Sequence, residues 1–162
     1  MTNTAETNKG LAAALGRIAS GLFVLTARQG EAETGMLASW VQQCSFDPPQ
    51  ISVAIKPGRD ISNWLAVDAG FTLNILDDTQ TDMIAHFGKG FKATETAFHG
   101  LDVEHLDQSG PVLSDALAFL ECRVVARYAG GDHDLIVGRI IRGEMLSGGH
   151  PMIHIRKSGS HY

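Results

Sequence analysis

The fold of this chain is decided by residues 16–49, where G-R-I-A-S-G-L-F-V-L-T (16–26) and G-M-L-A-S-W-V-Q-Q-C-S-F-D-P-P (35–49) flank a short polar turn. The two apolar runs predict a hairpin of strands Leu22–Thr26 and Thr34–Ser39. The second run ends in small and polar residues before a rigid Asp-Pro-Pro. Because small side chains let a flat ligand lie against backbone amides, this end of the hairpin is a candidate binding surface.

Further strands follow, joined mostly by short connections. Alternating apolar residues predict strands over 51–55, 71–76, 120–127, 135–146 and 151–156. Short helices are expected over 11–18, after a cap at Asp60, and after a cap at Asp78 or Thr79. Because these connections are too short for parallel crossovers, the pattern favours a β-barrel or sandwich. We expect residues 1–10 to be a flexible N-terminus and 11–162 to form one domain.

Composition and charge exclude several classes of protein. The chain has 162 residues and a net charge of −5 without a basic patch, so we expect no nucleic-acid partner. It has no apolar run long enough to span a bilayer and no apolar signal core, so we expect a cytoplasmic protein without membrane contact. The two cysteines lie far apart, which predicts free thiols. His150, His154 and His161 lie close in sequence, but Pro151 argues against helical ligand spacing, so we expect no metal.

Common nucleotide-binding and hydrolase motifs are absent from the sequence. There is no G-x-G-x-x-G after a strand, no P-loop, no G-x-S-x-G and no H-E-x-x-H. A nicotinamide would therefore be bound without a Rossmann fold. A flavin-using barrel meets that condition, because the flavin carries the hydride chemistry and the protein supplies position and electrostatics.

Several segments, in one order, resemble the flavin reductase family, whose members bind FMN in a split β-barrel. They are G-M-L-A-S with S-F-D-P-P, K-P-G-R-D-I-S-N-W, A-H-F-G-K-G-F and G-D-H-D-L-I-V-G. The blocks P-V-L-S-D-A-L-A-F-L-E-C and P-M-I-H-I-R-K-S-G-S-H-Y resemble the flavin reductase module fused to cyanobacterial flavodiiron proteins. The resemblance covers residues 11–162 and implies a mainly β fold, an FMN-binding split β-barrel with short flanking helices. Since the chain has no diiron or flavodoxin part, we expect a stand-alone version of that module.

The resemblance also assigns residues to a flavin site. It places the ring at Met36–Ser45, the phosphate near Lys56, Arg59 and the following helix start, and the ribityl-phosphate near 86–89. It aims His133 at the flavin face where nicotinamide stacks, as the residue that serves the hydride step. The expected cofactor-binding residues are Met36, Leu37, Ala38, Ser39, Trp40, Cys44, Ser45, Lys56, Arg59, Ser62, His86, Phe87 and Lys89, and the expected catalytic residue is His133.

Each of these segments also has a purely structural interpretation. Met36–Ser45 fits an edge strand with a polar exit loop, and Lys56–Trp64 fits a solvated surface turn. Phe87 fits a core position, with His86 as a helix-end cation favoured by the dipole. Gly131–His133 fits an ordinary hairpin turn, which is compatible with a site.

The expected function is that of an NAD(P)H:flavin oxidoreductase. It would bind FMN, with FAD as the alternative, and use NADH or NADPH. Electrons would pass on to a free flavin, a partner protein, ferric iron or oxygen. We expect a homodimer with contacts at Trp40 and Leu135–Leu146. Two alternatives are a non-catalytic FMN-binding relay module that serves a partner protein, and a flavin-free barrel used for protein contacts.

Overall fold

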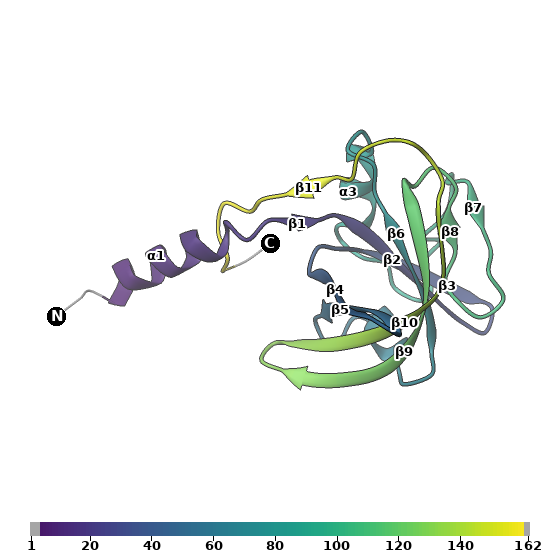
Figure 1. Ribbon diagram of the computed structural model, residues 1–162, viewed down its shortest axis with the longest axis horizontal. Coiled ribbons are helices and arrows are strands. Elements are labelled where there is room, and N and C mark those ends of the chain that lie inside the picture. Colours follow the sequence, from purple (N-terminus) through teal and green to yellow (C-terminus); the bar gives the residue numbers. More distant parts are fainter. Residues whose placement is uncertain (1–3, 161–162) are drawn as a thin grey trace.

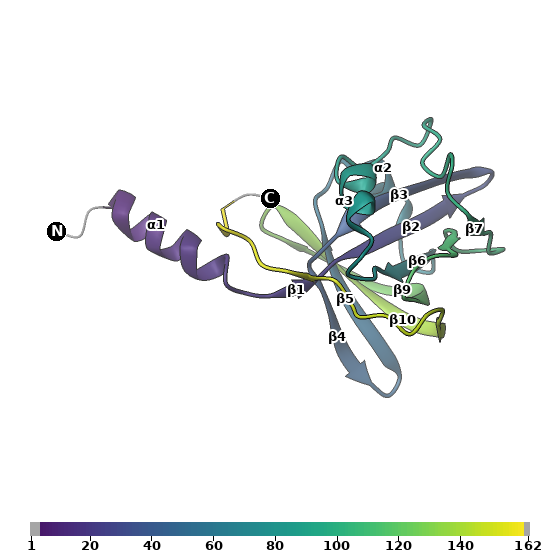
Figure 2. The ribbon, with the colours of Figure 1, turned by 90° about the horizontal axis from the view of Figure 1, so that it is seen from above.

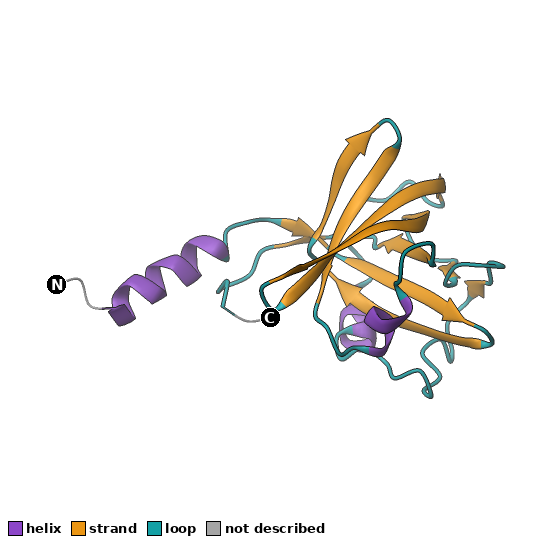
Figure 3. Cartoon of the chain, turned by 90° about the horizontal axis from the view of Figure 1, so that it is seen from below, coloured by secondary structure: helices purple, strands orange, loops and turns teal. Residues whose placement is uncertain are grey.

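One curled antiparallel sheet forms the body of the protein (Figure 1, Figure 3). The computed structural model describes residues 4–160. The seven strands of this sheet lie in the order β3-β2-β6-β9-β10-β5-β4 and make the split β-barrel that the sequence predicts. Their bounds are β2 (Phe23–Gln29), β3 (Ala32–Ala38), β4 (Val41–Phe46), β5 (Pro49–Ile55), β6 (Gly70–Ile75), β9 (Ala118–Gly130) and β10 (His133–Met145).

The predicted hairpin of residues 22–39 is confirmed. Strands β2 and β3 pair from Phe23 opposite Ala38 to Gln29 opposite Ala32, so both strands are longer than expected. The polar exit loop of the structural alternative is not present after β3, because residues 41–46 form β4 and pair with β5. A register shift in this pairing places Cys44 at a β-bulge.

Apolar side chains pack on both faces of β2. Leu25 and Ala27 point into the barrel and pack with β5, β6, β9 and β10 side chains such as Val53. Leu22 and Val24 face the other way, toward a second cluster that contains Phe87. A strand buried on both faces reads as a continuous apolar run, which explains why the segment F-V-L stands out in the sequence.

Two short helices cover one side of the barrel, as Figure 2 shows beside β2 and β3. They are α2 (Asp60–Trp64) and α3 (Thr81–Phe87). The expected side-chain caps are wrong, because Arg59 and Gln80 occupy the N-cap positions and neither caps with its side chain. The Asp60 carboxylate instead accepts a hydrogen bond from Ala93 N, at 2.8 Å.

The first and last strands of the chain pair with each other beside the barrel. Helix α1 (Thr4–Leu15) projects away in Figures 1 and 2, and β1 (Ser20–Gly21) pairs with β11 (Ile153–His154). The helix begins and ends earlier than the sequence predicted, and Leu11, Leu15 and Ile18 stay exposed. Among residues 4–160, no helix has the length and apolar character needed to cross a membrane.

A polar ladder that sequence reasoning missed fixes the long loop after α3. Thr26 and Thr72 lie opposite each other in the sheet, and both are completely buried. Their hydroxyls donate to the carbonyl oxygens of Pro111 (2.7 Å) and Gly110 (2.6 Å). The same loop forms the small β7 (Val103–Glu104) and β8 (Val112–Leu113) pair. These bonds tie the loop to the sheet and give both buried hydroxyls an acceptor.

Candidate functional site

A cavity of about 290 Å³ opens where the end of β3, the end of β5, α3 and the β9–β10 hairpin approach one another. Its wall combines aliphatic side chains, one indole, two cations and two imidazoles. The lining residues are Leu22, Met36, Leu37, Ala38, Ser39, Trp40, Ala54, Lys56, Arg59, Ile84, Gly88, His133 and His154. A mainly apolar pocket with a few convergent polar groups is the usual form of a site for an organic ligand.

The structure brings most of the predicted site residues together in this wall. Residues 36–40, Lys56, Arg59 and His133 come from three separate segments of the chain and line the same cavity. At Ser39 and Trp40 the chain leaves the sheet ladder between β3 and β4. The small residues predicted to accommodate a flat ligand are therefore at the place where the backbone turns away from its neighbours.

Other predicted residues lie elsewhere. Cys44 and Ser45 are on β4, outside the lining of this cavity. Phe87 is completely buried in the second apolar cluster. It is therefore a core residue, which was the structural alternative for this segment. His86 Nε2 donates to the Ala97 carbonyl oxygen at 2.8 Å, and Lys89 lines a neighbouring cavity.

His133 is the first residue of β10 and stands at the mouth of the β9–β10 hairpin. Its Nδ1 lies 2.8 Å from Asp132 Oδ1 and donates to that carboxylate when it carries the ring proton. Only 10% of the His133 side chain is exposed. The hydrogen bond from His133, together with the charges of His133 and Lys56, lowers the pKa of Asp132 although burial opposes it. Asp132 therefore orients the imidazole as an ionised carboxylate.

The C-terminal segment contributes a wall that sequence reasoning missed. The His133 and Trp40 rings have centroids 4.7 Å apart, and the Arg156 guanidinium lies 5.1 Å from the centre of the Trp40 ring. His154, on β11, lines the cavity beside them. The indole is thus held between a cation and an imidazole. The pairing of β11 with β1, which the sequence pattern did not predict, brings these residues to the site.

The two cations of the cavity face different neighbours. Lys56 follows Ile55, which pairs with Asp134, so Lys56 lies next to the His133 turn. Arg59 reaches the opposite loop, where NH1 donates to the Lys89 carbonyl oxygen at 3.2 Å. An anionic group in the cavity would meet one cation on each of two sides.

An arginine network joins the hairpin to the segment after Arg59. Arg127 Nε and NH2 donate to Asp134 Oδ2 at 2.9 and 2.6 Å. Its NH1 donates to the Ser62 carbonyl oxygen at 2.6 Å and NH2 donates to the Ser62 hydroxyl at 3.0 Å. Ser62 is completely buried, so the structure gives its hydroxyl to Arg127 and keeps it out of the cavity wall.

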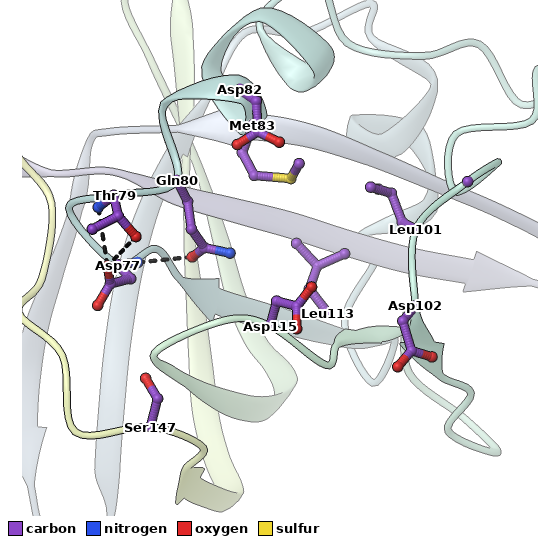
Figure 4. Close-up of a pocket in the computed structure, with 11 residues that line it drawn as sticks. Asp77, Thr79, Gln80, Asp82, Met83, Leu101, Asp102, Leu113, Asp115 and Ser147 are labelled. Atoms are coloured by element: carbon purple, nitrogen blue, oxygen red, sulfur yellow. Dashed lines mark hydrogen bonds between the residues drawn. The ribbon is translucent and has the colours of Figure 1, made fainter.

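A larger cavity of about 520 Å³ lies outside α3 and has the opposite electrostatic character (Figure 4). Four carboxylates line it, from Asp77, Asp82, Asp102 and Asp115. The Thr79 hydroxyl and backbone N–H both donate to Asp77 and lower its pKa. Because this cavity would repel a phosphate-bearing ligand, size alone does not make it the flavin site. Among the described residues, no group of potential ligands could hold a metal, and His161 lies outside them.

Comparison with known proteins identifies the family. A model described as "Flavin reductase like domain" matches residues 15–160. The chain belongs to the flavin reductase family.

Relatives of this flavin reductase family member include much longer proteins. Diflavin flavoprotein A 1 of Synechocystis sp. is 38% identical over 151 residues, which cover 92% of this chain and 26% of that protein. The chain thus spans about a quarter of the length of the curated relatives it matches. The styrene monooxygenase flavin reductase of Pseudomonas putida is 26% identical, with a TM-score of 0.74 over 88% of this chain and 90% of that one. The NADH:FAD oxidoreductase of Streptomyces globisporus shares the fold, with 23% identity and a TM-score of 0.80 over 88% and 85% of the two chains.

Proposed function

We propose that this chain is an NAD(P)H-dependent flavin reductase that binds FMN or FAD in the cavity beside Trp40. One observation carries the proposal: residues 36–40, Lys56, Arg59 and His133 were assigned to a flavin site from three separate motifs, and they line one cavity. Membership of the flavin reductase family supports the oxidoreductase class.

The residues present fit a flavin. The aliphatic side chains of Met36, Leu37 and Ala38 offer an apolar surface for a flat ring system, and the small Ser39 leaves the backbone accessible. Lys56 and Arg59 supply the positive charge that a phosphate requires, each worth about 1.5–3 kcal/mol when the contact is charge-assisted. Bound flavin would supply the hydride-accepting chemistry, and the protein would supply orientation and charge.

His133 is the residue that we assign to the nicotinamide. Its Nδ1 is committed to Asp132, so the ring orientation is fixed and Nε2 faces away from that carboxylate. The imidazole can then position the carboxamide of the co-substrate or hold a proton during reduction. Trp40 and Arg156 fix the other side of this region and limit how a second planar ring approaches.

We also propose a homodimer that completes this site. Large apolar side chains are exposed on both strands of the β9–β10 hairpin: Val125 and Tyr128 on β9, and Leu135, Ile141, Met145 and Leu146 in the segment predicted to make the contact. Exposed apolar side chains gathered on one element favour a protein interface. Sedimentation of the flavin-loaded protein should show a dimer, whereas a stable monomer with full flavin occupancy would contradict this proposal.

An anaerobic titration tests the proposed function directly. Flavin-loaded protein should lose its yellow absorbance on addition of NADH or NADPH, followed by reoxidation with trial acceptors. The second candidate is a relay module that serves a partner, suggested by the match to one quarter of larger diflavin proteins. Such a module would bind flavin and be reduced by dithionite, but neither nicotinamide would bleach it.

A further inference from the structure

The C-terminal segment brings one more cation to the rim of the candidate flavin site. The Arg156 guanidinium lies 5.1 Å from the centre of the Trp40 ring, and Trp40 lines the cavity. His154, two residues earlier in the chain, lines the same cavity, whereas Arg156 does not belong to its lining. Arg156 is therefore placed beside the cavity, where it can meet a ligand that extends out of it.

The backbone on both sides of Arg156 is fixed to other parts of the chain. Before it, β11 pairs with β1, and the two strands run side by side in Figure 1. After it, Gly159 N donates to the Ala12 carbonyl oxygen at 2.7 Å. A Cβ at Gly16 would come within 2.7 Å of the Arg156 carbonyl oxygen, so a glycine is needed for this close approach. These contacts hold the backbone at position 156 without using its side chain.

The Arg156 guanidinium has hydrogen-bonding capacity left for a ligand. Among the hydrogen bonds and ion pairs within residues 4–160, none involves the Arg156 side chain. A guanidinium that contacts an aromatic ring keeps N–H donors at its edge, and their fork matches two oxygens of a phosphate. Since Arg156 is only half-buried, a ligand in solution can reach these donors. A phosphate group is therefore the ligand that this side chain suits best.

We propose that Arg156 binds the pyrophosphate of the nicotinamide dinucleotide and helps to determine the affinity for this co-substrate. The inference rests on the proposed function, because it requires flavin in the cavity and the nicotinamide ring at His133. Trp40 contacts both residues, and its ring centre lies 4.7 Å from that of His133. In the dinucleotide a single ribose separates the nicotinamide ring from the pyrophosphate. A single indole likewise separates His133 from Arg156, so the pyrophosphate is the phosphate group nearest to this cation.

Two other phosphate groups could also meet a cation at this rim. The flavin phosphate is assigned to Lys56 and Arg59, which line the cavity itself, whereas Arg156 is outside the lining. The extra phosphate of NADPH is on the adenosine half of the dinucleotide, farther from the nicotinamide ring than the pyrophosphate is. The three phosphate groups predict different effects of one substitution.

The test compares Arg156→Ala with Lys157→Ala, which removes an exposed cation from the neighbouring position. Flavin-loaded proteins are reduced anaerobically by NADH, by NADPH and by N-benzyl-dihydronicotinamide, which has the nicotinamide ring but no phosphate. The half-saturating concentration of each reductant is measured from the rate at which the flavin bleaches. We expect Arg156→Ala to raise it about tenfold for NADH and NADPH alike, and to leave it unchanged for the benzyl compound. Arg156→Lys keeps the charge without the fork of donors, so its increase should be smaller. Lys157→Ala should alter none of the three values.

The other outcomes overturn the inference in distinguishable ways. An increase confined to NADPH would assign Arg156 to the extra phosphate, and a weaker affinity for FMN but not for riboflavin would assign it to the flavin phosphate. An equal increase with the benzyl compound would show that Arg156 only positions Trp40. No increase with a variant that circular dichroism shows to be folded would exclude a contact with the dinucleotide. If none of the three reductants bleaches the flavin of the wild-type protein, the proposed function fails together with this inference.

Discussion

Arg127→Ala should destabilise the protein and also loosen the flavin site. The side chain makes two hydrogen bonds to Asp134 and two to Ser62, so its loss disconnects the β9–β10 hairpin from α2. Asp134 immediately follows His133 in the sequence, and Ser62 belongs to the helix that follows Arg59. One substitution therefore removes a direct link between the elements that carry His133 and Arg59, the residues to which we assign hydride transfer and phosphate binding.

The expected loss of stability follows from how far the Arg127 and Asp134 side chains are exposed to solvent. The Arg127 and Asp134 side chains are 28% and 16% exposed, between a surface pair worth about 0–1 kcal/mol and a buried pair whose disruption costs about 3–5 kcal/mol. We therefore expect a loss of about 2–3 kcal/mol in the free energy of unfolding. For a chain of this length that corresponds to a fall in Tm of roughly 5–10 °C, measured by thermal denaturation followed by circular dichroism.

Arg139→Ala is the matched control, because Arg139 lies on β10, the other strand of the same hairpin, and is exposed. It should change Tm by no more than about 2 °C. Arg127→Lys keeps the charge but not the fork of donors, so it should recover only part of the stability. A Tm for Arg127→Ala equal to that of the control would refute the reasoning. Stability lost with unchanged affinity for flavin would show that the network supports the fold without positioning the site.

Four other substitutions or treatments test single elements of the site. Ser39→Leu should reduce flavin retention by steric exclusion, and unchanged affinity in a folded variant would move the ring elsewhere. Arg59→Ala should weaken FMN about tenfold or more but riboflavin much less, because riboflavin has no phosphate; equal losses would argue against a phosphate role. His133→Ala should keep its flavin and be reduced normally by dithionite, yet about 10²-fold or more slowly by nicotinamide; wild-type reduction kinetics would remove the catalytic assignment. At pH 8 the native protein should react with a thiol reagent at the exposed Cys44 alone, because burial raises the pKa of the Cys122 thiol to about 12; two fast-reacting thiols would contradict this.

The sequence predicted those parts of the fold that local patterns determine. Strand β2 is buried on both faces and β9 alternates around Cys122 and Val124, so both carry strong periodic signals. The turn at Gly131 predicted the β9–β10 hairpin, where that glycine has φ of +61°. The resemblance to the flavin reductase family, carried by the short motifs, predicted which segments meet at the cavity.

The parts that were missed depend on contacts between distant segments. Strand β4 is polar along much of its length and is held by its partner β5, so its own sequence resembles a loop. Arg156 reaches Trp40 only because β11 pairs with β1 across most of the chain. Short polar strands and long-range cation–aromatic contacts have no periodic signature, and single-sequence patterns therefore do not find them.

The site combines residues that local sequence motifs predicted with residues that only contacts between distant segments bring into place. The groups assigned to the ligands, Ser39, Arg59 and His133, lie at strand ends and in turns, where local sequence fixes their identity. Their relative positions are fixed by groups that do not line the cavity, above all Arg127. In our proposal, ligand recognition and site geometry are thus carried by different residues. Substitution of Arg127 should therefore weaken flavin and nicotinamide use together, whereas Arg59→Ala and His133→Ala should each affect mainly one of the two ligands.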